Sequence, residues 1–208
     1  MSTNTLSLAS HGPVIPVIVI QKLEHAVPLA QALVAGGVRV LEVTLRTPVA
    51  LEAMEAMARA VPDAIVGAGT LRTPADVQAA KNAGCQFGVS PGYTDALAAA
   101  CKEFGLPLLP GVSTASEVMQ ASSAGFQFLK LFPAVAVGGV NLLKALSGPF
   151  PDIAFCPTGG ITPETAPQFL SLPNVKVCGG SWLTPQDAMD AGDWGRITAL
   201  AKAASALR

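Results

Sequence analysis

Short apolar segments rich in β-branched residues recur along the chain, and stretches with helical spacing separate them. Eight such segments begin at Val14, Val38, Ala64, Cys85, Pro107, Phe126, Ile153 and Val175. The intervening "TPVALEAMEAMARAV" and "TDALAAACKEFG" place apolar residues at helical intervals behind a threonine that suits a helix start. Strands that alternate with helices favour right-handed crossovers and a parallel sheet.

Eight strand–helix units in 208 residues match the lower size limit of a (β/α)8 barrel, the TIM barrel. We therefore predict an α/β fold in which residues 1–208 form a single (β/α)8 barrel domain. The alternative is a doubly wound open sheet. It is disfavoured because "VIVIQKLEH" at the first strand lacks the GxGxxG pattern of dinucleotide-binding sheets.

Charge and cysteine usage narrow the class of partner. The chain carries 14 acidic and 13 basic side chains without a Lys/Arg cluster, which argues against nucleic acid and anionic membranes as partners. No apolar run approaches the ~20 residues of a membrane helix. Four cysteines lie scattered without a CxxC pair, as expected for reduced thiols. We expect a cytoplasmic protein that binds a small molecule.

A metal site is not expected from the histidines. His11 and His25 lie apart, and neither belongs to an HxH or HExxH pattern. Only a magnesium ion bound by carboxylates remains possible, because oxygen ligands can come from distant loops without a local spacing pattern.

In a (β/α)8 barrel the chemistry takes place at the C-terminal ends of the strands. Here those ends are polar or glycine-rich, reading Glu42 to Arg46, "GAGT", "SPG", "GVST", "KLFPA", "PTGG" and "GGS". One of them holds a lysine, since Phe126, Phe128, Lys130 and Phe132 share a parity and predict an inward face. Burial disfavours the charged form of a lysine. Lys130 is therefore either half of a structural ion pair or a nucleophile.

Two other lysines are weaker candidates. Lys176 falls early in the last predicted strand, so its side chain is expected to reach water at the opposite end of the barrel. Lys22 follows the first strand in the helix-start context "QKLEH", which favours a solvated side chain.

The second strand also turns polar toward its end, where Glu42, Thr44 and Arg46 share a parity. An inward carboxylate needs a partner. One interpretation pairs Glu42 with Arg46 in a purely structural ion pair. The other gives Glu42 proton transfer and gives Arg46 a forked contact with an anionic substrate group.

Glycine pairs end the last two predicted strands, in "TGG" at residues 158–160 and "GGS" at residues 179–181. Many barrels bind phosphate at this place through backbone NH groups. We therefore predict a phosphate site there.

Longer motifs carry a resemblance to a known family. In order along nearly the whole chain stand "PVIPVIVI", "KLEHAVPLAQALVAGGVRVLEVTLRT", "AIVGAGT", "SPG", "PGVSTASE", "KLFPA", "FCPTGGI" and "GGSWL". With them the sequence resembles the 2-keto-3-deoxy-6-phosphogluconate (KDPG) aldolases, a family whose members also act on 4-hydroxy-2-oxoglutarate (KHG).

The resemblance implies a class I aldolase, a lyase of the Entner–Doudoroff pathway that cleaves KDPG to pyruvate and glyceraldehyde 3-phosphate. KHG would give pyruvate and glyoxylate. Lys130 would form the Schiff base and Glu42 would be the acid/base. The remaining substrate contacts that it implies are Arg46 and Thr70 for the pyruvyl carboxylate, Thr158 for the hydroxyl-bearing part, Gly159, Gly160, Gly179, Gly180 and Ser181 for the phosphate, and Pro91 and Phe132 for the pocket wall. The resemblance implies no cofactor and a cytoplasmic homotrimer.

Two other function classes use the same features. A phosphosugar isomerase or epimerase would share the phosphate site but leave Lys130 without a covalent role. A non-catalytic phosphometabolite sensor would only pair Lys130 with Glu42. Fold analogy does not separate the three, whereas Lys130, Glu42, Arg46 and Thr70 at neighbouring strand ends favour the aldolase.

Overall fold

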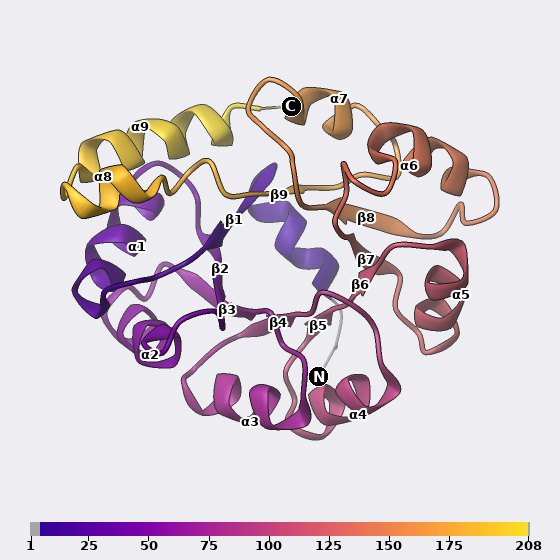
Figure 1. Cartoon of the computed structure of the whole chain (residues 1–208), viewed down its shortest axis with the longest axis horizontal. Helices are drawn as coiled ribbons and strands as arrows, with labels where there is room; N and C mark the ends of the chain where they lie inside the picture. Colours follow the sequence, from indigo (N-terminus) through magenta and orange to yellow (C-terminus); the bar gives the residue numbers. More distant parts are fainter. Residues whose placement is uncertain (1–4, 208) are drawn as a thin grey trace.

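Parallel strands surrounded by helices make up the computed structural model, which describes residues 5–207 (Figure 1). One sheet has the order β5-β4-β3-β2-β1-β9 and a second has the order β6-β7-β8, and every pair is parallel. The strands are β1 (Val14–Ile18), β2 (Val40–Thr44), β3 (Ile65–Gly69), β4 (Phe87–Val89), β5 (Leu108–Leu109), β6 (Gly111–Val112), β7 (Phe128–Leu131), β8 (Ala154–Pro157) and β9 (Cys178–Gly180).

All eight predicted strand segments contain a strand, and the fifth is divided at Pro110 into β5 and β6. Proline has no NH group for the ladder, so the sheet is interrupted there. At the β8 edge of the three-stranded sheet, isolated bridges join Phe155 to Val175 and Thr158 to Gly179, which links the β8 segment to the β9 segment. The structure thus establishes an α/β fold with a curled parallel sheet of six strands.

In Figure 1 the indigo 3-10 helix η1 (Thr5–His11) is seen in the middle of the ring of strands, and the other helices lie around the outside. They are α1 (Ala26–Ala35), α2 (Ala50–Ala60), α3 (Pro74–Asn82), α4 (Asp95–Glu103), α5 (Ala115–Ser123), α6 (Gly139–Ser147), α7 (Ala166–Leu170), α8 (Gln186–Asp190) and α9 (Trp194–Ser205), with 3-10 helices η1 (Thr5–His11) and η2 (Leu23–His25). The two stretches with the clearest helical spacing became α2 and α4. Threonine side chains cap α3, α4 and α5 by accepting from a backbone NH of the first turn.

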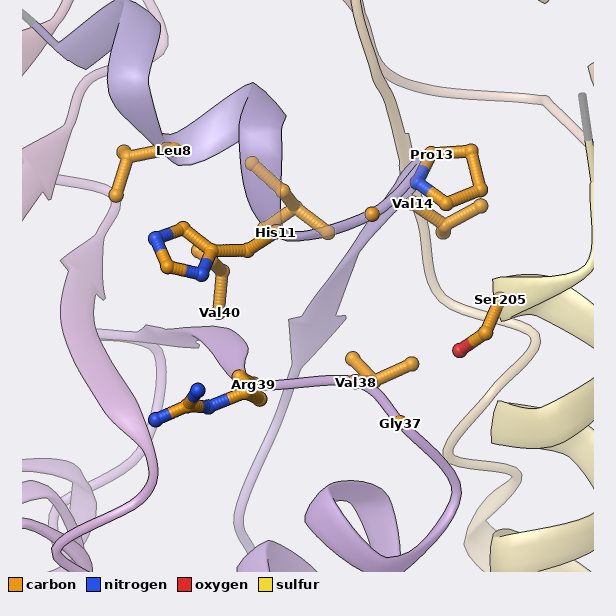
Figure 2. A pocket seen from close by; sticks show the side chains of 11 residues that line it. Leu8, His11, Pro13, Val14, Gly37, Val38, Arg39, Val40 and Ser205 are labelled. Atoms are coloured by element: carbon orange, nitrogen blue, oxygen red, sulfur yellow. The ribbon is translucent and has the colours of Figure 1, made fainter.

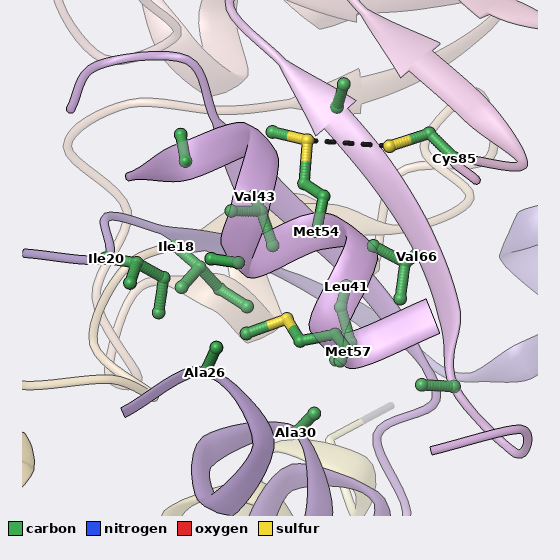
Figure 3. Packing of buried hydrophobic residues seen from close by; sticks show 14 of the residues in the cluster. Ile18, Ile20, Ala26, Ala30, Leu41, Val43, Met54, Met57, Val66 and Cys85 are labelled. Carbon is green, nitrogen blue, oxygen red and sulfur yellow. Dashed lines mark hydrogen bonds between the residues drawn. The ribbon is translucent and has the colours of Figure 1, made fainter. Parts of the chain in front are cut away.

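The hydrophobic core has an outer and an inner part. Outside the sheet, Met54 and Met57 of α2 pack on Leu41 of β2 and Val66 of β3 (Figure 3). Inside the curl lies a separate cluster of inward side chains: Ile15, Val40, Phe87, Val89, Leu109, Phe128, Ala154 and Cys156 from the strands, Val177 just before β9, and Leu8 of η1. The strand interior is therefore packed rather than hollow.

The 3-10 helix η1 covers the N-terminal end of the strands. Leu8 packs into the inner cluster, and the Thr5 hydroxyl donates to the Leu108 carbonyl at 3.4 Å. Figure 2 shows the hollow that remains where η1 ends, between His11 and the segment from Val38 to Val40. This end of the sheet interior is therefore covered by η1.

All four cysteines, Cys85, Cys101, Cys156 and Cys178, are free and buried. Burial raises the pKa of the Cys85 thiol to about 12, and its sulfur lies 3.5 Å from that of Met54 (dashed in Figure 3). No helix within residues 5–207 is long and apolar enough to cross a membrane.

Candidate active site

Lys130 lies in the middle of β7, and its side chain points into the curl of the sheet, as strand parity predicts. Only 5% of the side chain is exposed. Its ammonium nitrogen lies 3.1 Å from Oε1 of Glu42, so it donates a charge-assisted hydrogen bond across the interior. The ring of Phe132 lies beside the same nitrogen, with its centroid at 5.3 Å.

Glu42 occupies the centre of β2, in register with Val17 of β1 and Gly67 of β3. Its side chain is 4% exposed and its ion pair is with Lys130. The alternative that paired Glu42 with Arg46 is therefore wrong. Residues four apart on a strand are separated by roughly 13 Å, and Arg46 lies beyond the end of β2.

Arg46 is exposed beyond the C-terminal end of β2, and its Nε donates to Oγ1 of Thr70 at 3.2 Å. Thr70 has φ +64°, the only positive φ among the non-glycine residues that the structure describes. A β-branched residue rarely adopts this conformation, and the strain costs on the order of 1–3 kcal/mol. The strained turn after β3 brings the Thr70 hydroxyl to the Arg46 guanidinium.

The lysine opens onto a cavity of about 130 Å³ at the C-terminal ends of the strands. Most of the predicted site residues line it: Arg46, Lys130, Phe132, Thr158, Gly159, Gly160, Gly179, Gly180 and Ser181. Glu42 and Thr70 are joined to it through hydrogen bonds to Lys130 and Arg46. Pro91 is exposed and is not among the lining residues.

Two glycine pairs line the cavity, Gly159–Gly160 after β8 and Gly179–Gly180 at the end of β9. Gly159 and Gly160 have φ +105° and +77°, which suit glycine, and no backbone acceptor within residues 5–207 takes their NH groups. Gly179 faces Thr158 so closely that a Cβ there would overlap the threonine hydroxyl. The NH groups of Gly159 and Gly160 and the Ser181 hydroxyl therefore offer donors at the cavity, an arrangement that suits an anion.

The other charged and metal-binding candidates lie away from the cavity. Lys22 is half exposed with its nitrogen 3.5 Å from Asp190, and Lys176 donates to the Pro173 carbonyl on the surface. His25 is buried edge-on to Trp194, with ring centroids 5.8 Å apart. In the described part of the chain no three His, Cys, Asp or Glu residues gather as metal ligands.

Some residues at the site were not predicted from sequence. Val17 and Ile161 line the cavity, and the Ser113 hydroxyl donates to the Phe132 carbonyl at 2.6 Å. Val17 shares its parity with the inward Ile15, so strand periodicity carried a signal for it. The Ser113 contact joins the ends of β6 and β7 and had no local signal.

A family model, related sequences and solved structures all identify the same family. The family model described as "Aldolase: KDPG and KHG aldolase" matches residues 6–200. A 2-dehydro-3-deoxy-phosphogluconate aldolase of Pseudoalteromonas atlantica is 56% identical over 95% of this chain and 92% of its own length. A KHG/KDPG aldolase of Escherichia coli K12 is 54% identical over 97% of this chain and 95% of its own.

Among solved structures, a KDPG aldolase from Legionella pneumophila superposes with a TM-score of 0.95 at 47% identity, covering 99% of both chains. That protein was captured with pyruvate as a covalent carbinolamine intermediate. The KDPG aldolase of Zymomonas mobilis ZM4 with 3-phosphoglycerate has a TM-score of 0.93 at 46% identity, covering 100% of this chain and 98% of its own.

Proposed function

Because this chain belongs to the KDPG and KHG aldolase family, we propose that it is a class I aldolase that cleaves KDPG to pyruvate and glyceraldehyde 3-phosphate. KHG, cleaved to pyruvate and glyoxylate, is its second substrate. The observation that carries the proposal is the buried Lys130–Glu42 pair at the base of the cavity, 3.1 Å apart. Such a pair holds an amine and a base within reach of one substrate carbon.

Covalent binding begins with Lys130. Glu42 accepts a proton from the ammonium, and the neutral amine attacks the 2-oxo carbon to form a carbinolamine. Glu42 returns this proton to the former carbonyl oxygen, which leaves as water, so an iminium and a Glu42 carboxylate remain. The near-complete burial of both side chains keeps their geometry fixed before substrate arrives.

Cleavage then uses the iminium as an electron sink. A carboxylate at Glu42, directly or through a water, takes the C4 hydroxyl proton as the C3–C4 bond breaks. The bond electrons move onto C3 and the iminium nitrogen, giving an enamine, and the aldehyde leaves. Glu42 returns a proton to C3, and hydrolysis frees pyruvate and Lys130.

The two ends of the cavity support opposite ends of the substrate. Arg46, held by Thr70, suits the carboxylate beside the 2-oxo group. The unpaired amides of Gly159 and Gly160 with the Ser181 hydroxyl suit the phosphate, and Thr158 between them faces the hydroxyl-bearing carbons. Gly179, Gly180 and Phe132 also line this cavity. Pro91 stays a prediction, since it is exposed and is not among the lining residues.

Borohydride reduction in the presence of pyruvate tests the covalent step. We expect a stable pyruvyl adduct, detected by intact mass and mapped to the peptide that contains Lys130. Lys22→Met is the matched control and should be labelled as fast as the parent protein, whereas Lys130→Met should not be labelled. An isomerase or a sensor would give no adduct, and an adduct on Lys22 would move the active amine.

Substrate choice is tested with Ser181→Glu. A carboxylate at this turn repels a phosphate dianion, so turnover of KDPG should fall far more than turnover of KHG. Ser171→Glu adds the same charge on an exposed residue after α7 and should leave both substrates unaffected. Equal losses with Ser181→Glu would place the phosphate elsewhere.

We further propose that the β6-β7-β8 sheet completes a closed (β/α)8 barrel, in which the bridges to β9 and the Pro110 interruption are the two junctions. The described residues share inner and outer clusters, which supports a single domain for residues 1–208. Free cysteines support a cytoplasmic enzyme. The family resemblance supports a homotrimer, which light scattering of the purified protein would test.

A further inference from the structure

Gly69, the last residue of β3, faces the carboxylate of Glu42. A Cβ built on Gly69 would lie 2.5 Å from Oε1, 2.8 Å from Cγ and 3.0 Å from Cδ of Glu42. Real Cβ atoms essentially never come this close to another heavy atom, so the Glu42 side chain occupies the space that any larger residue at 69 would fill.

Backbone conformation does not explain this glycine. Gly69 lies within a strand and is absent from the residues with positive φ, so its backbone suits any residue. Its carbonyl accepts from the Leu45 NH at 2.9 Å, which keeps the end of β3 against β2. Gly159, by contrast, has φ +105°. Residue 69 is therefore glycine because the Glu42 side chain leaves no room there for a Cβ.

The inward face of β3 takes in side chains from both of its neighbours. At Gly67 the space is filled by the ring of Phe87 from β4, and at Gly69 by the Glu42 carboxylate from β2. Phe87 belongs to the inner apolar cluster. Two contacts therefore fix the position of the Glu42 carboxylate. Lys130 holds one of its oxygens at 3.1 Å, and Gly69 leaves the space that the carboxylate fills.

We propose that Gly69 is a positioning residue for proton transfer, because it admits the Glu42 carboxylate to the place where it reaches Lys130 and the substrate. The proposal rests on the acid/base role of Glu42 proposed above. Restoring an ordinary contact of 3.4 Å from 2.5 Å would move the carboxylate by about 0.9 Å. A misplacement of about 1 Å at a reacting group can cost roughly 10²-fold in rate.

The test compares Gly69→Ala with Glu42→Gln and with the double variant. For each, the exchange of pyruvate methyl protons with deuterated solvent and the rate of borohydride trapping are measured. Gly69→Ala should slow exchange by about 10- to 10²-fold and leave the KM for pyruvate near its original value. In the Glu42→Gln background the alanine should cause no further loss. Gly148→Ala, where a Cβ meets nothing within 4 Å, is the matched control and should exchange normally.

The outcomes distinguish the acid/base role of Glu42 from the positioning role of Gly69. Normal exchange in Glu42→Gln would remove the acid/base role of Glu42, whatever Gly69→Ala does. Slow exchange in Glu42→Gln with normal exchange in Gly69→Ala would overturn the positioning role, as would losses that multiply in the double variant. If Gly69→Ala does not fold, Glu42→Ala with and without Gly69→Ala decides, because Glu42→Ala removes Cγ, Cδ and Oε1, the three atoms that the methyl would meet. A double variant that folds as stably as Glu42→Ala supports the proposal, and one that also fails to fold overturns it.

Discussion

Replacing Lys130 by methionine should destabilise the protein in a way that depends on pH. The change keeps the length of the side chain and removes the ammonium that pairs with Glu42 at 3.1 Å. Because the Glu42 side chain is 4% exposed, water does not replace the lost partner. Leaving one member of a buried pair unpaired typically costs about 3–5 kcal/mol.

The cost of protonating the Glu42 carboxylate sets an upper limit on this loss of stability. A glutamate carboxyl group titrates near pH 4.3 in short peptides, so protonating one at pH 7 costs about 3.7 kcal/mol. In a chain of 208 residues the unfolding entropy is roughly 0.44 kcal/mol per degree, so Tm should fall by about 8 °C. The folded variant then binds one proton more than the unfolded chain. Its destabilisation therefore shrinks by about 1.4 kcal/mol per pH unit as the pH falls toward 4.3.

Glu42→Met should show the opposite pH dependence. It leaves the Lys130 amine without its partner, and a lysine that loses its proton at pH 7 costs about 4.6 kcal/mol. Here the unfolded chain binds the extra proton, so the destabilisation shrinks as the pH rises. The double variant replaces the pair by two apolar side chains of similar length. It should lie close to the parent protein in stability and show neither slope.

Urea unfolding followed by circular dichroism between pH 5.5 and 8.5 measures all four proteins. The expected result is two single variants whose free energies of unfolding change with pH in opposite directions. Single variants that each lose less than about 1 kcal/mol without a pH slope would behave like an exposed ion pair. They would refute the conclusion that the Lys130–Glu42 pair is buried.

Other predictions follow from the strained and the close-packed positions. Thr70→Gly should not lower the free energy of unfolding, because relief of about 1–3 kcal/mol of strain offsets about 0.5–1 kcal/mol of glycine entropy, while the KM for pyruvate rises. Gly179→Ala should lower kcat on KDPG, since its Cβ overlaps the Thr158 hydroxyl; an unchanged kcat would contradict this. Chelators should leave turnover unchanged, because in the proposed mechanism the Lys130 iminium is the electron sink, and activity restored by a divalent ion would refute this. Burial raises the pKa of the Cys85, Cys101 and Cys156 thiols to about 12, so the folded protein keeps these protons where the unfolded chain loses them. The stability that comes from burying the neutral thiols is therefore complete below about pH 8.5 and is lost as the pH rises toward 12. Alkylation at pH 8 should be slow until urea unfolds the chain.

The order of strands and helices could be predicted because each depends on local periodicity. Alternation along "FQFLKL" placed Lys130 inward, and β7 has the same orientation in the structure. The polar strand ends likewise identified the end of the curled sheet at which the cavity lies. These features follow from backbone geometry over a few residues, which the chain carries wherever it folds.

The division of the fifth strand depended on more than its apolar pattern. "PLLPGVST" was predicted as one strand, and Pro110 divides it into β5 and β6 in different sheets. A proline is compatible with an edge or an interruption, and its neighbours in the sheet decide which occurs.

By itself, the sequence determined which residues face inward and at which strand ends they lie, since periodicity belongs to a single strand. Only the tertiary structure decided that Glu42 meets Lys130, 88 residues away, while Arg46 meets Thr70. It also decided that Gly69 makes room for Glu42. Contacts across the interior depend on how far the sheet curls and how each strand is shifted against the next. Both are set by the packing of all the helices and strands together, so no local pattern encodes them.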